Sequence, residues 1–258
     1  MAIIIKTPEE IEILRAGGKR LAAILSAVAK KVAPGVSTSE LDAYAQKLIK
    51  DGGDEAAFLN YQPYGASFPY PAALCTSVNS EVVHGIPNKK RILKEGDIIS
   101  LDLGLKHKGM FTDHAITVPV GTVSKDAQML LKTTHEALHA GIFAAVAGAR
   151  VGDIGAAIEA QAKRLKYGIV DVLSGHGVGR EIHEDPYVPN FGKKGTGAQL
   201  KPGMVIAIEP MFNIGTKNVV LADDGYTYRT LDGKLSAHFE HTILITDGEP
   251  EILTALVE

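Results

Sequence analysis

The sequence predicts an α+β fold of two similar halves, because the same order of elements occurs twice in the chain. Two helical segments precede a stretch of short strands in residues 7–120, and this order returns in residues 124–247. The strands repeat in detail, since residues 93–102 read LKEGDIISLD and residues 200–209 read LKPGMVIAIE. Two copies are too few for a solenoid, which needs three or more repeats. We therefore expect one domain over residues 1–258 in which both halves share a core.

The helices of the first half are indicated by apolar periodicity and by their end signals. We expect the first helix over residues 9–32, after Thr7 or Pro8 and before the break at Pro34. The second helix ends at Gly52, and three residues are candidates for its N-cap: Ser37, Thr38 and Ser39. In the second half, the matching helices are expected over residues 124–146 and 152–168, with a break at Gly148.

Four acidic residues occupy matching places in the two halves. Asp102 and Glu209 end the ten-residue repeat, and both lie in runs that otherwise read as buried strand. Asp113 and Glu240 open the strands DHAITV and EHTILI. Acidic side chains are rarely buried unless they are paired or coordinated. One such residue would be typical of a salt bridge or a loop cap, but two matched pairs indicate a shared site.

The packing of the two halves about a pseudo-twofold axis would bring these four carboxylates together. Charges about 4 Å apart repel by about 4 kcal/mol per pair at an effective dielectric of about 20. Divalent cations would remove this repulsion, so the sequence predicts a metal site between the halves.

Three histidines are expected at this site. His176 lies in SGHGVGR, where flanking glycines allow a close backbone approach and leave the imidazole clear as a nitrogen ligand. His84 in VHGIP and His183 in IHEDP are related by the repeat, and we expect either to donate a hydrogen bond to a developing oxyanion. His114 and His241 directly follow acidic residues and point to the other strand face, so we do not expect them as ligands.

Composition excludes several classes of protein. The chain is 45% hydrophobic and 22% charged with a net charge of −3, which is typical of a globular protein without a basic field for nucleic acid or anionic membranes. Its apolar runs are shorter than the ~20 residues of a membrane span, and the first ten residues do not read as an export signal. The single cysteine, Cys75, allows no internal disulfide and fits a cytoplasmic location. Carboxylate and imidazole must therefore hold any metal.

Four carboxylates and one imidazole suit two hard or borderline divalent ions, with Co, Mn, Fe, Zn and Ni all compatible. Paired metals of this kind serve hydrolytic enzymes such as aminopeptidases, phosphatases and nucleases. The net acidic charge favours a peptide over a phosphate substrate. A phosphate-handling enzyme would need cationic clamps, and the candidates are more typical of a solvated loop: Arg180, Lys193 and Lys194.

Several motifs together resemble the type I methionine aminopeptidases. They are CTSVNSEVVHGIP, LDLG, the eleven-residue step from Asp102 to Asp113, GHGVGREIHEDP, IEP and SAHFEHT, in this order over nearly the whole chain. The resemblance implies the pita-bread fold, a dinuclear metal centre, and removal of the initiator methionine from new polypeptides whose second residue is small.

The resemblance also implies a role for each site residue. Asp113 and Glu240 would bridge the metals, Asp102 would chelate one, and His176 with Glu209 would complete the other. Glu209 would handle the proton of the attacking water, while His84 and His183 would contact the substrate and steady the tetrahedral intermediate. The substrate's methionine side chain would enter an apolar pocket, whose best matches are Tyr70, Cys75 and Phe68.

The chain departs from the family pattern around this pocket. The segment YQPYGASFPYP is longer than usual, which affects the assignment of Phe68. Ile182 stands where an aromatic residue is common, and Tyr226 stands where some members carry Trp. Two alternatives stay open, namely a proline-specific dipeptidase of the same fold and a non-catalytic binding protein that has lost its metals.

The resemblance further implies the partners of the chain. It implies a monomer that acts on nascent polypeptide N-termini and contacts the ribosome near the exit tunnel, where Lys106 and Lys108 are the candidate contacts. The net charge and the short apolar runs predict no specific nucleic-acid sequence and no membrane partner.

Overall fold

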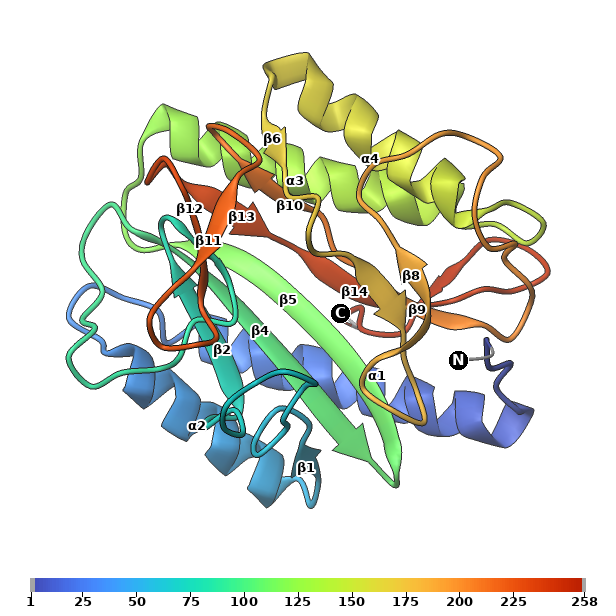
Figure 1. The fold of residues 1–258 in the computed structure, drawn as a ribbon. Helices are drawn as coiled ribbons and strands as arrows, with labels where there is room; N and C mark the ends of the chain where they lie inside the picture. Colours follow the sequence, from blue (N-terminus) through green and yellow to red (C-terminus); the bar gives the residue numbers. More distant parts are fainter. Residues whose placement is uncertain (1–2, 257–258) are drawn as a thin grey trace.

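Four helices and fifteen strands make up residues 3–256, the part of the chain that the computed structural model describes (Figure 1). The helices are α1 (Pro8–Ala29), α2 (Thr38–Asp51), α3 (Lys125–Ala144) and α4 (Val151–Leu165). The strands of the first half are β1 (Glu55–Ala56), β2 (Leu74–Val78), β3 (Glu81–Val83), β4 (Ile98–His107) and β5 (Met110–Pro119). Those of the second half are β6 (Gly168–Ile169), β7 (Gly175–Gly177), β8 (Glu184–Val188), β9 (Val205–Ile208), β10 (Met211–Asn213), β11 (Val219–Leu221), β12 (Tyr228–Thr230), β13 (Ser236–His238), β14 (Glu240–Leu244) and β15 (Glu251–Ile252).

The expected helices are present, and their ends follow local chemistry. Thr7 caps α1 and pairs with Glu10 in a capping box, and Ser37 caps α2 in the same way. Helix α4 ends earlier than Gly168, because Lys166 adopts the left-handed conformation with φ of 57° and so stops the helix.

The main sheet joins the two halves side by side. Its strand order is β1-β4-β5-β14-β9-β7-β8, with β2 also paired to β4 and β15 to β14. All strand pairs within the described residues are antiparallel, and the halves meet where β5 pairs with β14. At this junction His241 lies opposite His114, two residues that hold matching positions in the expected repeat. This register supports our proposal that residues 7–120 and 124–247 are structural repeats within one domain.

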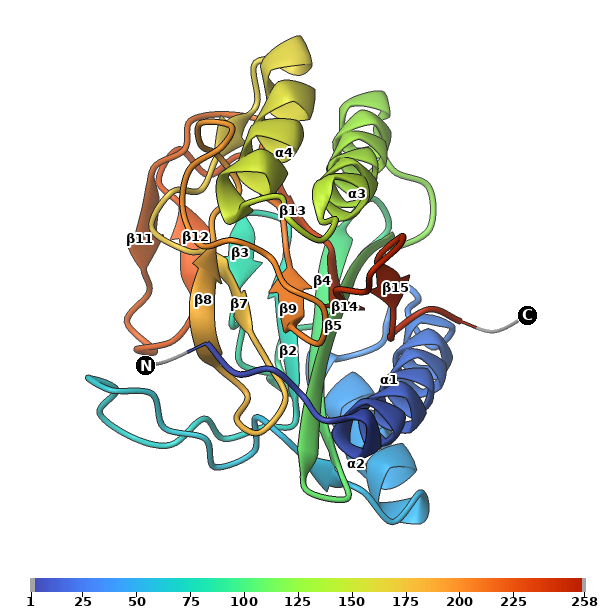
Figure 2. The same ribbon diagram turned by 90° about the vertical axis from the view of Figure 1, so that its right-hand side faces the viewer.

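Each half packs its helix pair on the sheet through its own apolar cluster. In the first half, Leu21, Leu25 and Leu41 of α1 and α2 pack with Leu101 and Leu103 of β4. Complete burial of such a side chain contributes about 1.5–3 kcal/mol. Figure 2 shows α1, α2 and α3 on the side of the long strands opposite β11 and β12.

In the second half, α3 and α4 pack on the sheet through a matching cluster. Leu138, Ile154 and Ile158 of these helices lie with Ile206 of β9 and Ile243 of β14. The expected α+β class with antiparallel sheets is confirmed, and the helices leave the other sheet face free to build a site.

Candidate metal centre

The register of the sheet places the acidic residues in one row. Ala115 of β5 lies opposite both Asp102 of β4 and Glu240 of β14. Paired residues of an antiparallel sheet project to the same face, and Asp113 shares that face because it is two residues from Ala115. Glu209 directly follows the last residue of β9, the strand that pairs with β14. The four carboxylates therefore converge from four strands, as the repeat predicts.

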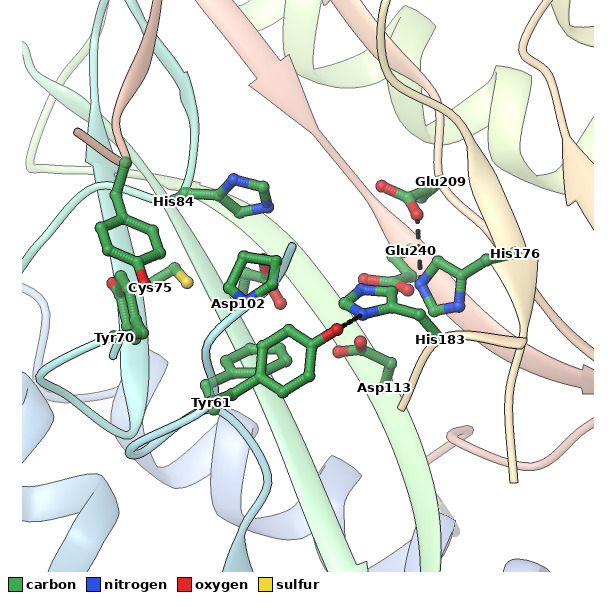
Figure 3. Close-up of a pocket in the computed structure, with 13 residues that line it drawn as sticks. Tyr61, Tyr70, Cys75, His84, Asp102, Asp113, His176, His183, Glu209 and Glu240 are labelled. Carbon is green, nitrogen blue, oxygen red and sulfur yellow. Dashed lines mark hydrogen bonds and ion pairs between the residues drawn. The ribbon is translucent and has the colours of Figure 1, made fainter. Parts of the chain in front are cut away.

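These carboxylates form the floor of a pocket on the face opposite the helices. Figure 3 shows the carboxyl groups and His176 pointing toward one space. The pocket is lined by Phe58, Tyr61, Pro63, Tyr70, Cys75, His84, Asp102, Asp113, His176, His183, Glu209, Tyr226 and Glu240. All five predicted metal ligands lie in this one cavity.

His176 presents Nε2 to the carboxylates. Its Nδ1 is 2.8 Å from the carbonyl oxygen of Gly177 and donates to it, which leaves Nε2 with a free lone pair, 3.5 Å from Glu209 Oε1. The flanking glycines are required here, because a Cβ on Gly175 would lie 2.3 Å from the Ala207 oxygen. A Cβ on Gly177 would lie 2.2 Å from the oxygen of Asp185. The close backbone approach expected from the sequence is thus present.

Burial of several acids in one cavity changes their protonation. Burial and the nearby Glu209 raise the pKa of Asp113 to about 8, and burial raises the pKa of Glu209 to about 8. The pKa values of Asp102 and Glu240 are raised well above their usual range, mainly by burial and then by Asp113. Burial lowers the pKa of His176 to about 3, so its imidazole is neutral at pH 7. The anionic cluster is therefore unfavourable without a compensating cation.

The donor set fits divalent metal ions. Within residues 3–256, the buried Oδ1 of Asp102 and Oε1 of Glu240 have no hydrogen-bond partner. One ligand atom each of Asp113, His176 and Glu240 lies within 4.8 Å of the other two. Carboxylate oxygens with one imidazole are ligands for hard and borderline divalent ions. The unpartnered oxygens are explained if they coordinate such an ion.

His84 occupies a backbone conformation that the surrounding hydrogen bonds maintain. Its φ is 60°, which is uncommon for a residue with a side chain and is often found at functional sites. The next residue, Gly85, donates its N–H to Ser77 Oγ and has no room for a Cβ, which would lie 2.4 Å from the Thr76 oxygen. Thr227 Oγ1 contacts the His84 oxygen at 3.5 Å and is itself held by Asp224.

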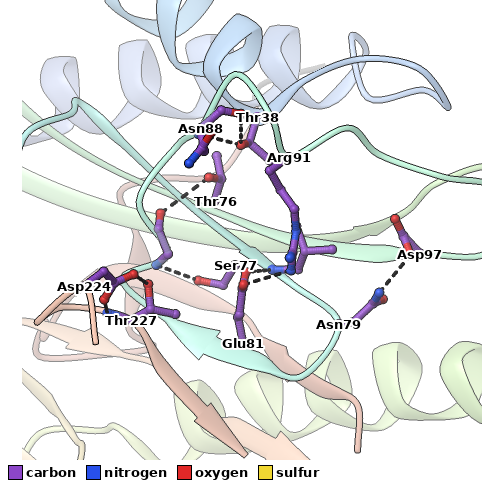
Figure 4. Close-up of polar contacts among 12 residues, drawn as sticks. Thr38, Thr76, Ser77, Asn79, Glu81, Asn88, Arg91, Asp97, Asp224 and Thr227 are labelled. Atoms are coloured by element: carbon purple, nitrogen blue, oxygen red, sulfur yellow. Dashed lines mark hydrogen bonds and ion pairs between the residues drawn. The ribbon is translucent and has the colours of Figure 1, made fainter. Parts of the chain in front are cut away.

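Figure 4 shows the wider network around this turn, in which Arg91 pairs with Glu81 and Asn79 with Asp97. Thr38 and Asn88 add a further hydrogen bond between α2 and the segment after His84. The turn that carries His84 is therefore anchored to several elements.

His183 lies beside His176, with ring centroids 4.5 Å apart. Its Nδ1 is 2.9 Å from the hydroxyl oxygen of Tyr61 (Figure 3). When this hydroxyl donates to Nδ1, the ring proton stays on Nε2 and can be donated elsewhere. Tyr61 was not among the sequence candidates, because it lies in the unusual loop and nothing in its local pattern relates it to a residue 122 positions away.

His238 is a second residue that the sequence interpretation missed. It is buried, and its Nε2 lies 3.4 Å from Glu209 Oε2. Burial lowers the pKa of His238 to about 3, so it is a neutral ring beside the carboxylate. A signal was available, because His238 precedes Glu240 by two residues in SAHFEHT and strand periodicity places both on one face.

The predicted side-chain pocket is present except for Phe68. Tyr70 and Cys75 are buried and line the cavity beside Tyr226. Phe68 is 41% exposed and is absent from the lining; its ring packs edge-on against Tyr226, 5.2 Å between centroids. The expectation that Phe68 lines the pocket is therefore wrong, because the long loop carries Phe68 to the outer side of Tyr226. Phe58 lines the cavity instead.

Comparison with known proteins agrees with this geometry. The family model described as metallopeptidase family M24 matches residues 12–247. A methionine aminopeptidase of Aquifex aeolicus is 48% identical, over 99% of this chain and 100% of its own length. The crystal structure of a methionine aminopeptidase from Thermotoga maritima matches with a TM-score of 0.93 and 42% identity, over 98% of this chain and 99% of that one.

A prolidase from Pyrococcus furiosus has the same fold at a greater distance. It matches with a TM-score of 0.75 and 27% identity, over 99% of this chain but 66% of the prolidase. The pita-bread fold and the resemblance found in the motifs are both confirmed. On the family match and the two full-length relatives, this chain belongs to metallopeptidase family M24.

Proposed function

We propose that this protein is a methionyl aminopeptidase, which removes the N-terminal methionine from nascent proteins and peptides when the second residue is small. The observation that carries the proposal is the position of the five-donor cluster at the floor of a pocket with aromatic and thiol walls. The polar floor can hold ions and the reacting groups, while Phe58, Tyr70, Cys75 and Tyr226 offer apolar contacts for a methionine side chain.

We propose that the five donors would together hold two divalent ions. Asp102, Asp113, His176, Glu209 and Glu240 would hold these ions, with Asp113 and Glu240 in the middle of the row of carboxylates. Ions bound here supply Lewis-acid polarisation of the scissile carbonyl and lower the pKa of water. Co, Mn, Fe, Zn and Ni all suit these donors, and their availability in the cell selects among them.

Side chains around the ions complete the chemistry. Glu209 accepts the proton of the attacking water and passes it to the departing amine, acting as general base and then as general acid. His84 and His183 are neutral donors that contact the peptide and stabilise the oxyanion of the tetrahedral intermediate. Tyr61 hydrogen-bonds to His183 and so orients that imidazole, while His238 lies beside Glu209.

The substrate assignment is tested with peptides that separate the two hydrolases of this fold. We expect the metal-loaded protein to release methionine from Met-Ala-Ser and to leave Ala-Pro intact, as followed by amino-acid analysis. A parallel reaction with excess chelator should stop the release. Turnover of Ala-Pro alone would instead support a proline-specific dipeptidase. Failure to cleave either peptide with bound metal would support a non-catalytic binding protein.

Other functions are less well supported by the site. A binding protein that had lost catalysis would have lost at least one donor, whereas all five are in place. A phosphate-handling enzyme would need free cations at the pocket, but Arg180 pairs with Glu10 and is absent from the lining.

Loss of the Tyr61 hydroxyl is expected to lower activity moderately. Tyr61→Phe removes only the hydroxyl that contacts His183 Nδ1, and a hydrogen bond contributes about 0.5–1.5 kcal/mol net. We expect kcat/KM for Met-Ala-Ser to fall about 2- to 13-fold. Tyr64→Phe is the matched control, because Tyr64 belongs to the same loop and its side chain is fully exposed. Equal activity of the two variants would show that Tyr61 does not position His183.

We further propose that the enzyme works as a cytoplasmic monomer on nascent chains near the ribosomal exit tunnel. Lys108 lies exposed in the turn between β4 and β5, and Lys106 pairs with Glu55 near that turn. Lys108 is therefore placed to contact an anionic surface, and Lys106 would do so by exchanging its partner Glu55. In the described part of the chain, no helix has the length and apolar character to cross a membrane.

A further inference from the structure

Four of the nine histidines form an array that takes no part in the proposed reaction. His114 and His241 stack at the junction of β5 and β14, with centroids 4.5 Å apart and planes at 14°. They directly follow Asp113 and Glu240, so strand alternation turns them to the sheet face away from the pocket. His135 and His139 of α3 continue the array outward, since the His139 ring lies 6.4 Å from that of His241.

His135 and His139 lie one turn apart on α3, and both are exposed. Residues at positions i and i+4 share one helix face. Their Nε2 atoms are 3.3 Å apart. With metal–nitrogen bonds of about 2.0–2.1 Å, two donors at this separation subtend an angle of about 104–111° at the metal. This angle is close to tetrahedral, so both nitrogens can bind one ion with little movement.

Each ring is supported from behind by another ring. His135 packs edge-on against Phe239 at 5.3 Å, and His139 packs against His241 at an interplanar angle of 62°. The Nδ1 of His241 in turn lies 2.8 Å from Thr254 Oγ1, which fixes that ring. The two exposed side chains are thus held in the rotamers that bring their Nε2 atoms together, and little rotamer entropy remains to be lost on binding.

The charge state of the pair also suits a metal. A metal ligand must be a neutral imidazole, and partial burial together with His139 lowers the pKa of His135. Without an ion, one Nε2–H donates to the other Nε2, and an ion would replace that proton. The carboxylate of Glu136 follows His135 directly and favours positive charge near this ring.

We propose that His135 and His139 chelate one borderline divalent ion, Ni²⁺, Cu²⁺ or Zn²⁺, at a surface site on α3 that is separate from the pocket. Imidazole ligands select these ions over Mg²⁺, Ca²⁺ and Mn²⁺. Water completes the coordination, because no third acidic, histidine or cysteine donor of residues 3–256 comes within 4.8 Å of both nitrogens. The site therefore binds more weakly than the five-donor centre and adds one metal to the protein when such ions are in excess.

Retention of the untagged protein on immobilised Ni²⁺ tests this site, because a tethered ion reaches the surface of α3 but not the pocket floor. At pH 7.5 we expect the protein to be retained and to elute with imidazole. His135→Gln and His139→Gln should each elute in the wash, since each removes one of the two donors. His183→Gln is the matched control and should be retained, because it removes the other exposed histidine, which lies at the pocket.

Release of methionine by the His135→Gln and His139→Gln proteins verifies that they are folded, as neither side chain touches the pocket. Two results would overturn the proposal. One is passage of the parent protein through the column without retention. The other is retention that survives either single substitution, since a single imidazole would then account for the binding.

Discussion

Exchange of Glu209 for glutamine is expected to lower kcat for Met-Ala-Ser by about 10²- to 10⁴-fold, the usual contribution of a general acid–base group. Glutamine keeps the size of the side chain but cannot accept the proton of the attacking water. The carboxylate lies beside the imidazoles of His176 and His238, at 3.5 and 3.4 Å, at the floor of the pocket. Initial rates at saturating peptide measure the effect.

Two measurements separate proton transfer from simple metal loss in the Glu209→Gln protein. The bound metal is determined in the same sample, and rates are compared at equal occupancy. Glu159→Gln is the matched control, because Glu159 is a half-buried carboxylate on α4 that is absent from the pocket lining. We expect its kcat to be unchanged. A Glu209→Gln protein that retains its metal and keeps the parent rate would remove Glu209 from the mechanism.

Loss of the Lys6 charge is expected to produce the largest change in stability. Lys6 Nζ donates to Glu184 Oε2 at 2.6 Å, and the two side chains are only 1% and 5% exposed. Removal of one partner of a buried ion pair leaves an uncompensated charge and costs about 3–5 kcal/mol. For a chain of this size, Lys6→Met should lower the melting temperature by about 6–20 °C. Thermal unfolding followed by circular dichroism measures the shift.

A double variant that also neutralises Glu184 is the control for the unpaired charge. Glu184 Oε1 accepts hydrogen bonds from the backbone N–H groups of Arg180 and Glu181, which a glutamine oxygen can keep. Lys6→Met with Glu184→Gln removes both charges and should recover most of the lost stability. If the double variant melts no higher than Lys6→Met, the cost does not arise from an unpaired charge. These bonds shape the loop that carries His183, so activity should follow the same order.

Much of the metal centre could be predicted from the sequence, because both the internal repeat and the alternation of a strand can be recognised from the order of residues alone. Asp102 and Glu209 were found by the ten-residue correspondence, and Asp113 and Glu240 by the second one. Strand alternation then placed His114 and His241 on the other face, where the structure has them. These inferences need only the order of residues and the alternation of a strand.

The parts that the sequence did not predict depend on contacts between distant segments. Tyr61 reaches His183 across a loop of unusual length, and the same loop carries Phe68 away from the pocket. The path of this loop decides on which side of Tyr226 the Phe68 ring packs. The residue types of the loop do not determine that path. His135 and His139 read as an ordinary exposed helix face until the rings of Phe239 and His241 are seen behind them.

Activity as a function of bound metal tests the central claim most directly. The His135→Gln, His139→Gln double variant is stripped with chelator, so that only the pocket remains to be filled, and Mn²⁺ is then returned in measured amounts. The rate of methionine release from Met-Ala-Ser should be zero without metal and should rise until two ions are bound per chain. Two results would contradict a mechanism that depends on these five donors. One is full release of methionine by the metal-free protein, and the other is an Asp113→Asn variant that binds metal and cleaves as well as its parent.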